Sequence, residues 1–179
     1  QVASNAGNEY FQHLVSAQEE ADTKLILHAV DAKNRGCQEL HIYSPDTDVL
    51  VIALSKLQKL PLNTFFNTGR GATKRSIALR PIYDYLGDVR ATAMIGFHAI
   101  SGCDTSGSLF GKGKQSYWKA MLNYPDVVPV FVQMGCTEKL TESMMMLMEA
   151  FICKVYVPTT KITSIGEMRW WMFRSRQAE

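Results

Sequence analysis

Apolar side chains recur along the chain with two different spacings, and each spacing predicts a different kind of element. Over residues 17–35 they return every three or four positions, which predicts an amphipathic helix that ends at Gly36. Residues 39–44 and 63–67 are short apolar segments next to turn-forming residues, and they predict two strands. Between the two strands, the apolar residues 49–57 predict a short helix.

Helical patterns dominate the rest of the chain. The predicted helices cover residues 81–86, 89–100, 115–122 and 138–156, and a last helix begins at Ser164. Glycine and serine predict a loop at 102–114. Two prolines near residue 125 mark the expected boundary between a domain at 1–125 and a helical extension at 126–179. Helices interleaved with few strands are typical of the α/β class.

Composition limits the class of protein. The 179 residues are 46% hydrophobic and 20% charged, which is typical of a globular chain and argues against a disordered, collagen-like or coiled-coil protein. The formal net charge is +2, so any nucleic-acid-binding surface has to be local. The apolar run at 49–54 is far shorter than the roughly 18 residues that cross a membrane, and no membrane partner is expected.

The cysteines and the start of the chain add two expectations. Four cysteines are scattered without a CxxC pair, which argues against a zinc site or a disulfide scaffold and favours reduced thiols in an intracellular protein. The chain begins with Gln1 instead of methionine, so a fragment or a processed chain is expected.

Acidic residues are few, yet five of them fall into three groups. They are Glu20 and Asp22 in the first predicted helix, Asp46 and Asp48 after the first predicted strand, and Asp104 in the glycine-rich loop. Residues two apart on an extended segment point to the same side, so Asp46 and Asp48 can converge. Sites in open α/β folds gather at the carboxyl ends of strands, which is where these two residues are expected.

Crowded carboxylates repel one another and are stable mainly when cations neutralise them. Ligands that are all oxygen favour Mg²⁺ or Mn²⁺. Glu20 and Asp22 would lie about 200° apart on a regular helix, so both reach one site only if that helix end is irregular or if each binds a different ion. Glu19 with Asp22 is the alternative pair. The competing interpretation is that these acids serve as helix caps and turn residues.

Four short motifs occur in a fixed order. They read EADTKL at 20–25, SPDTDVL at 44–50, GCD at 102–104 and GKGK at 111–114. Together they resemble the flap endonuclease/XPG nucleases, whose helix start, two-aspartate strand end, Gly-Ser/Cys-Asp and Gly-x-Gly motifs follow in this order over about 16–121. The amino-acid sequences of these motifs are closer still to those of uncharacterised reading frames in animal genomes, which look like mobile-element-derived PIN-like proteins.

The resemblance implies a fold and an activity. The fold would be the carboxyl-terminal portion of a PIN-like domain, with a mainly parallel sheet flanked by helices on both faces. The activity would be hydrolysis of phosphodiesters in structured nucleic acid by two Mg²⁺ or Mn²⁺ ions. The implied metal ligands are Glu20, Asp22, Asp46, Asp48 and Asp104, of which the last three would be catalytic. The implied partner is duplex or branched DNA, with RNA as the alternative, and the implied location is nuclear.

The resemblance also assigns the last motif. Gly111 and Gly113 match a hairpin that binds the duplex backbone through its amides and a K⁺ ion, and Lys112 and Lys114 would contact phosphates. The acids that the family carries on an earlier strand do not precede Ser16, so an amino-terminal half is expected to be missing.

Several alternatives stay open at this stage. A catalytically inactive, transposon-derived domain that binds nucleic acid or protein accounts for the same motifs, and so does a helical module in which the acids never meet. The basic turn with Arg70, Lys74 and Arg75 is either a phosphate contact or a solvated loop. Tyr117 and Trp118 are either base-stacking or core residues.

Overall fold

The computed structural model describes Leu14 and residues 21–104, 106–134 and 136–177. The chain forms two compact units, Gln1–Tyr85 and Leu86–Glu179. The division falls inside α3 (Leu79–Ile100), next to Gly87, where φ is +72° and the helix is kinked. The sequence predicts two separate helices at 81–86 and 89–100, and the non-helical backbone of Gly87 separates two helical segments of α3 at this point. The expected boundary near residue 125 lies inside the second unit.

The first unit is built from alternating helices and strands, as predicted. Its elements are α1 (Ala21–Asn34), β1 (Glu39–Tyr43), α2 (Thr47–Ser55), η2 (Leu57–Lys59), β2 (Asn63–Thr68), η3 (Gly71–Thr73) and β3 (Arg75–Ala78), followed by the start of α3. The predicted strands at 39–44 and 63–67 and the predicted helix at 49–57 are thereby confirmed to within two residues. The α/β class is confirmed as well.

The sheet of the first unit is mixed, which corrects the expectation of a mainly parallel sheet. β1 pairs with β2 in parallel, with His41 opposite Phe65, whereas β2 pairs with β3 antiparallel, with Phe66 opposite Ile77. The antiparallel pair arises because the basic turn at 69–74 is short and returns the chain directly alongside β2. β3 was not predicted, because its four residues contain one large apolar side chain, Ile77, and so show no strand pattern.

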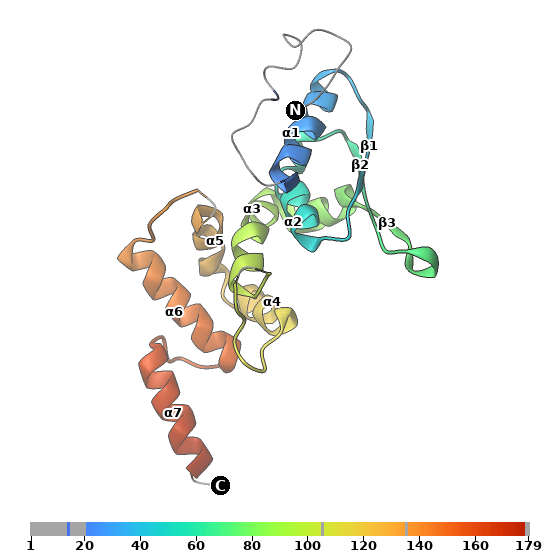
Figure 1. Ribbon diagram of the computed structural model, residues 1–179. Helices are drawn as coiled ribbons and strands as arrows, with labels where there is room; N and C mark the ends of the chain where they lie inside the picture. The colour runs from blue at the N-terminus through green and yellow to red at the C-terminus, as the bar shows by residue number, and fades with distance from the viewer. Residues whose placement is uncertain (1–13, 15–20, 105, 135, 178–179) are drawn as a thin grey trace. The chain divides into compact units, whose positions relative to one another are not determined.

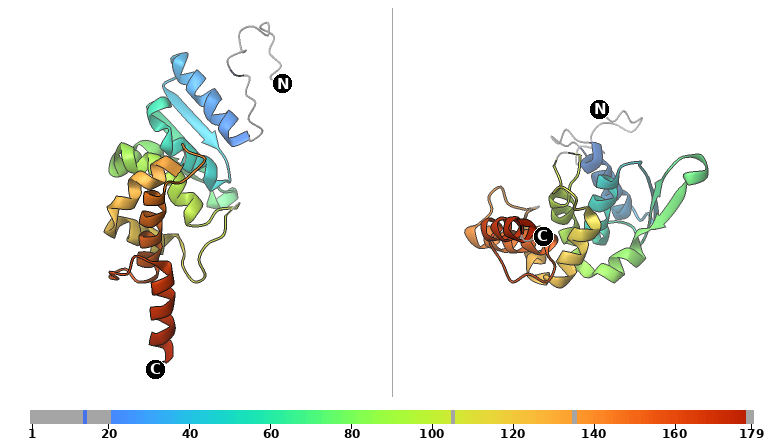
Figure 2. Two further views of the ribbon diagram at one scale, coloured as in Figure 1. Left: turned by 90° about the vertical axis from the view of Figure 1, so that its left-hand side faces the viewer. Right: turned by 90° about the horizontal axis from the view of Figure 1, so that it is seen from below.

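One face of this sheet carries the core of the first unit. Ile42 and Phe66 are 3% and 1% exposed; Ile42 lies between exposed neighbours on β1, and Phe66 lies between half-buried neighbours on β2. The helices α1 and α2 both lie on one side of the sheet (Figures 1 and 2) and contribute Ala29 and Val49 to the core. Among the described residues of this unit, no helix covers the opposite face, which carries His41 and Tyr43.

The second unit is entirely helical. After the carboxyl-terminal part of α3 come α4 (Lys114–Asn123), η4 (Pro125–Val127), α5 (Val128–Met134), α6 (Glu142–Tyr156) and α7 (Ile165–Gln177). Three fully buried aromatic side chains, Tyr117, Phe131 and Phe151, form the centre of its core, and the last two meet edge to face with ring centroids 5.3 Å apart. Among the described residues, no helix has the length and hydropathy that crossing a bilayer requires.

Candidate metal and nucleic-acid site

Asp46 and Asp48 lie where the sequence predicts them, at the carboxyl end of β1. Asp46 is the N-cap of α2, and its Oδ1 accepts a hydrogen bond of 2.8 Å from the backbone N–H of Asp48. The backbone N–H of Asp46 donates to Ser44 Oγ at 3.0 Å, and the N–H of Ser44 donates to the carbonyl of Asn67 at 3.1 Å. The two half-buried carboxylates are therefore anchored to the ends of both parallel strands.

The physical reason for their proximity differs from the expected one. Asp46 has an extended backbone (φ −86°, ψ 130°), but Asp48 already lies in the first turn of α2. The alternation rule for extended segments thus does not apply to this pair, and the cap turn holds the two residues together instead. The capping role that was weighed as the alternative for these acids is real, and it leaves the second oxygen of Asp46 for other ligands.

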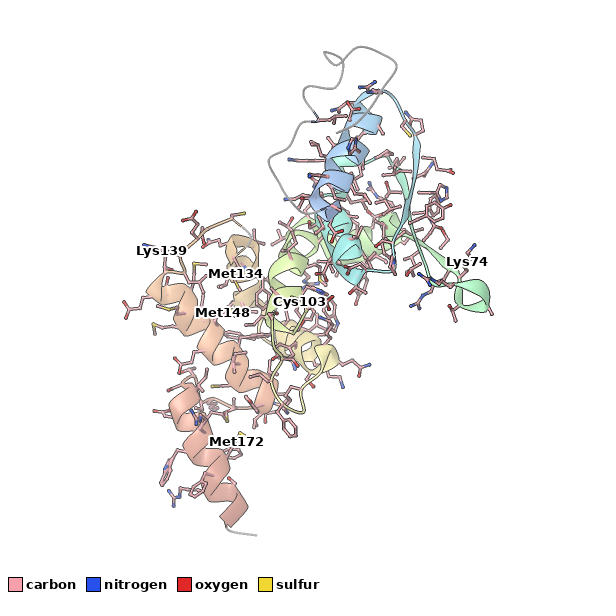
Figure 3. All side chains as sticks on the ribbon, viewed as in Figure 1. Lys74, Cys103, Met134, Lys139, Met148 and Met172 are labelled. Carbon is pink, nitrogen blue, oxygen red and sulfur yellow. The ribbon has the colours of Figure 1, made fainter. Side chains whose placement is uncertain are left out.

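A basic groove of about 500 Å³ opens at the same edge of the sheet. Its walls are residues 43–45 after β1, residues 67–70 after β2, and Lys74, Arg75 and Ser76 on the returning strand. Arg70, Lys74 and Arg75 are exposed, and none of the ion pairs found among the described residues includes them. Figure 3 shows the side chain of Lys74 extending outward from the tip of the turn. These three positive charges are therefore accessible to an anion.

The turn that carries these charges is ordered by its own hydrogen bonds. Thr73 Oγ1 donates to the carbonyl of Arg70 at 2.8 Å and accepts from the N–H of Arg70 at 3.1 Å. Gly69 has φ +84°, a conformation that other residues rarely adopt, and a Cβ at this position would overlap the carbonyl of Thr73. Fixed backbone geometry means that the cations are presented in one arrangement.

Asp104 lies in the second unit, on a short turn after α3. Cys103 and Ser106 form an isolated bridge through two backbone hydrogen bonds of 3.1 and 3.2 Å, and Ser106 Oγ donates to the carbonyl of Ala99. Asp104 is exposed at this turn, and Figure 3 labels its neighbour Cys103.

The two lysines of the Gly-Lys-Gly-Lys motif contact the protein itself. Lys114 Nζ lies within hydrogen-bond distance of the carbonyl of Gly102, Ser101 Oγ and His98 Nδ1. Lys112 Nζ donates to the carbonyl of Tyr156 at 3.1 Å and lies 5.6 Å from the centre of the Tyr156 ring. Both ammonium groups thus hold the loop against the rest of the unit. Sequence reasoning missed this role because the acceptors are backbone carbonyls or residues distant in sequence.

Gly111 and Gly113 shape the end of this loop. Gly111 has φ +70°, and Gly113 is the N-cap of α4 with no side chain to occupy the helix amides. The amino terminus of α4 therefore has no side-chain cap, although the amide of Ser116 donates to the carbonyl of Gly113 at 2.8 Å. The predicted K⁺ ion between the two glycines stays a prediction.

The predicted five-acid cluster spans both units. Glu20 lies outside the described residues, and Asp22 is half-buried in the first turn of α1. Asp22, Asp46 and Asp48 belong to the first unit and Asp104 to the second. Within the described part of either unit, no three His, Cys, Asp or Glu side chains form a metal-binding group. The complete cluster and its ions stay a prediction.

The aromatic residues next to the motif belong to the core. Tyr117 is fully buried, and burial raises the pKa of its hydroxyl, which accepts a hydrogen bond from the N–H of Leu109 at 3.3 Å. Trp118 packs edge to face on Phe97, with ring centroids 5.7 Å apart. Tyr117 is therefore unavailable for stacking on a base, whereas the half-buried Trp118 keeps part of its ring at the surface.

Comparisons with known proteins add no relative. Neither the protein-family models, nor the curated proteins, nor the solved structures contain a match to this chain.

Proposed function

We propose that this chain carries part of a metal-dependent phosphodiesterase that acts on structured nucleic acid. The observation that supports it is the edge of the sheet at the carboxyl ends of β1 and β2. There, the half-buried Asp46 and Asp48 lie next to a groove with three accessible cations. Metal-dependent phosphodiester hydrolysis uses both features, because carboxylates are common ligands of divalent ions and positive charge attracts the substrate backbone.

The roles of the residues follow from their positions. Asp46 and Asp48 would bind Mg²⁺ or Mn²⁺, which supplies an activated water and stabilises the leaving oxygen. Arg70, Lys74 and Arg75 would hold the neighbouring phosphates and so orient the scissile one. Glu20, Asp22 and Asp104 would complete the ligand set, as the resemblance to flap nucleases implies.

The second unit would supply a grip on duplex DNA. Its support is the amino terminus of α4, where Gly113 leaves the first amides without a side-chain cap and Lys112 and Lys114 add two positive charges. A helix amino terminus and nearby ammonium groups both attract phosphate. Such a grip contacts the backbone and does not read the sequence of bases.

A second candidate function is nucleic-acid binding without cleavage. The N-cap role of Asp46 favours it, because this aspartate has a structural purpose even when no metal is present. The basic groove and the α4 terminus would serve such a binder equally well.

Metal binding separates these candidates and is testable on the whole chain. Mg²⁺ or Mn²⁺ should raise the melting temperature, since an ion that binds the native state stabilises it. Replacing Asp46→Asn together with Asp48→Asn should abolish the increase. Asparagine still caps helices, so the double variant keeps the fold. Asp126→Asn, which removes an exposed carboxylate of the second unit, is the matched control and should behave as the parent.

Cleavage of a labelled branched DNA by the parent chain with Mn²⁺, absent in the double variant, would support hydrolysis directly. Equal thermal stabilisation of the double variant by the metal would contradict the assignment of Asp46 and Asp48. A binder that retains DNA affinity without any metal-induced stabilisation would favour the second candidate.

A further inference from the structure

The outer face of the sheet in the first unit carries a row of aromatic rings. His41 and Phe65 stand opposite each other on β1 and β2, and their rings stack with centroids 5.0 Å apart and planes 13° from parallel. The ring of Tyr43 follows on the same face of β1, 6.3 Å from His41. Tyr43 is 74% exposed, whereas the ring of His41 stacks against those of Phe65 and Tyr43, so Tyr43 offers the most accessible ring of this row.

The aromatic row leads directly into the basic groove. Tyr43 is itself one wall of that groove, and Arg70, Lys74 and Arg75 line the other side. Rings and cations therefore form one continuous surface within a single unit. At the far end of the row, Glu39 Oε1 lies 2.9 Å from His41 Nε2, so the surface becomes acidic there.

The chemistry of this face favours a nucleic acid over a packed helix. A helix layer packs on a largely apolar face, but only Phe65 is wholly apolar among the residues that share the outer face of β1 and β2: Glu39, His41, Tyr43, Asn63, Phe65 and Asn67. Exposed rings beside a cluster of cations are what single-stranded nucleic acids bind, because unpaired bases stack on the rings and phosphates pair with the charges.

We infer that a single-stranded nucleic acid binds across this face, with a base stacked on the exposed ring of Tyr43 and its phosphates held by Arg70, Lys74 and Arg75. Duplex bases are already stacked on one another and do not offer their faces, so the surface selects unpaired segments. This inference rests on the proposed function, which makes the ligand a nucleic acid. It adds that the part of the substrate bound at this face is single-stranded.

The groove also limits the path of the strand. Bases on Tyr43 bring the next phosphates to the turn at 69–75, which is the edge of the sheet where Asp46 and Asp48 lie. The acidic side chain of Glu39 marks the opposite limit of the path. The contact is therefore short, within the roughly 4 to 16 nucleotides that single domains cover.

The test is fluorescence anisotropy of the whole chain with a labelled oligo(dT) of about 12 nucleotides and with the same strand in a duplex. Tyr43→Ala should weaken binding of the single strand by about 5- to 150-fold, the range for loss of one stacked base. Tyr43→Phe keeps the ring and should bind as the parent does. Tyr85→Ala is the matched control, because Tyr85 is 75% exposed, belongs to the same unit and is not part of the groove.

The charges are tested by the dependence of affinity on salt. Arg70→Ala with Lys74→Ala should flatten the slope of log affinity against log salt by about 1.4 units, because each lost contact to a single strand contributes about 0.7. Lys56→Ala with Lys59→Ala removes the same charge from exposed positions elsewhere in this unit and should change the slope much less.

The outcomes distinguish this inference from the proposed hydrolysis. Single-strand affinity that is unchanged in Tyr43→Ala, or duplex affinity that falls in this variant as much as single-strand affinity does, would overturn the inference even if the chain cleaves DNA. A loss of affinity confined to the single strand in Tyr43→Ala would support it even if the parent chain shows no stabilisation by metal and no cleavage. If Arg70→Ala with Lys74→Ala and Lys56→Ala with Lys59→Ala change the salt slope equally, binding follows net charge alone. That result would also overturn the inference.

Discussion

The side chain of Asp46 accepts the backbone N–H of Asp48 at 2.8 Å, so one proposed metal ligand also fixes the position of the other. This single hydrogen bond caps α2 and closes the turn that follows β1. The stability of α2 and the proposed metal binding therefore depend on the same atom pair. A variant has to separate the loss of the helix cap from the loss of a metal ligand.

We expect Asp46→Ala to lower the free energy of unfolding by about 0.5–2 kcal/mol, the usual cost of losing an N-cap. Asp46→Asn keeps an acceptor oxygen and should lie close to the parent. Far-UV circular dichroism in urea is the suitable measurement, because all three tryptophans lie in the second unit and do not report on α2. If asparagine costs as much as alanine, the carboxylate stabilises the fold by its charge and not as a cap.

The lysines of the Gly-Lys-Gly-Lys motif make a different prediction. Lys112→Ala with Lys114→Ala should flatten the salt dependence of duplex affinity by up to about 2 units, roughly 0.9 for each lost phosphate contact. A tethered ammonium still carries its charge, so the hydrogen bonds of Lys114 to the loop do not remove this effect. Lys139→Ala with Lys161→Ala is the control, since both side chains are exposed in the same unit.

The same double variant tests the tethering role. Removing the contacts of Lys114 to the end of α3 and of Lys112 to Tyr156 should lower the melting temperature of the second unit. A lower melting temperature with an unchanged salt slope would show that the two lysines serve only the loop, and the duplex grip would then lack its charges.

Gly96 gives a prediction about packing in the second unit. A Cβ on this residue of α3 would lie 2.5 Å from the carbonyl oxygen of Phe131 and 2.8 Å from its Cα, so α3 and α5 approach closely there. Gly96→Ala should therefore destabilise the unit by about 1–3 kcal/mol, despite alanine's higher helix propensity. Gly107→Ala, where a Cβ meets nothing within 4 Å, is the control. Tryptophan fluorescence in urea measures both, and equal stability of the two variants would contradict the close approach.

The elements that sequence predicted well are those whose burial follows a simple period. β1 has a buried Ile42 between exposed neighbours. The helix predicted at 138–156 corresponds to α6, which begins later, at Glu142, where the hydroxyl of the N-cap Thr141 accepts from the amide of Met144. Local patterns of this kind need no knowledge of distant contacts, and they located Asp46 and Asp48 correctly at the end of a strand.

What sequence did not predict depends on contacts between distant residues. β3 is a strand because β2 supplies its hydrogen bonds. The short helix α5 is buried because Phe131 packs into a core formed by other helices. The close approach at Gly96 and the tether of Lys114 likewise depend on partners outside the local segment. The aromatic row was missed because His41 and Phe65 become neighbours only through the register of the parallel pair.

The last prediction concerns Cys153, whose side chain is fully buried in α6. Burial raises the pKa of this thiol above its ordinary value, and the nearby carboxylate of Glu149 raises it further. The folded chain therefore keeps the thiol proton over a pH range in which the unfolded chain releases it. Stability from this group is present below the ordinary thiol pKa and is lost as the pH rises through the raised one.

Thiol alkylation followed by peptide mass spectrometry checks this prediction directly. The exposed Cys136 should react quickly, whereas Cys153 should react only when the second unit opens. An opening free energy of about 3 kcal/mol already slows the reaction roughly 100-fold relative to an exposed thiol. Cys136→Ala should remove the fast phase and leave the slow one, and urea should merge the two in the parent. Labelling of Cys153 as fast as that of Cys136 under native conditions would contradict the buried position, because the thiolate that reacts forms only where water reaches the sulfur.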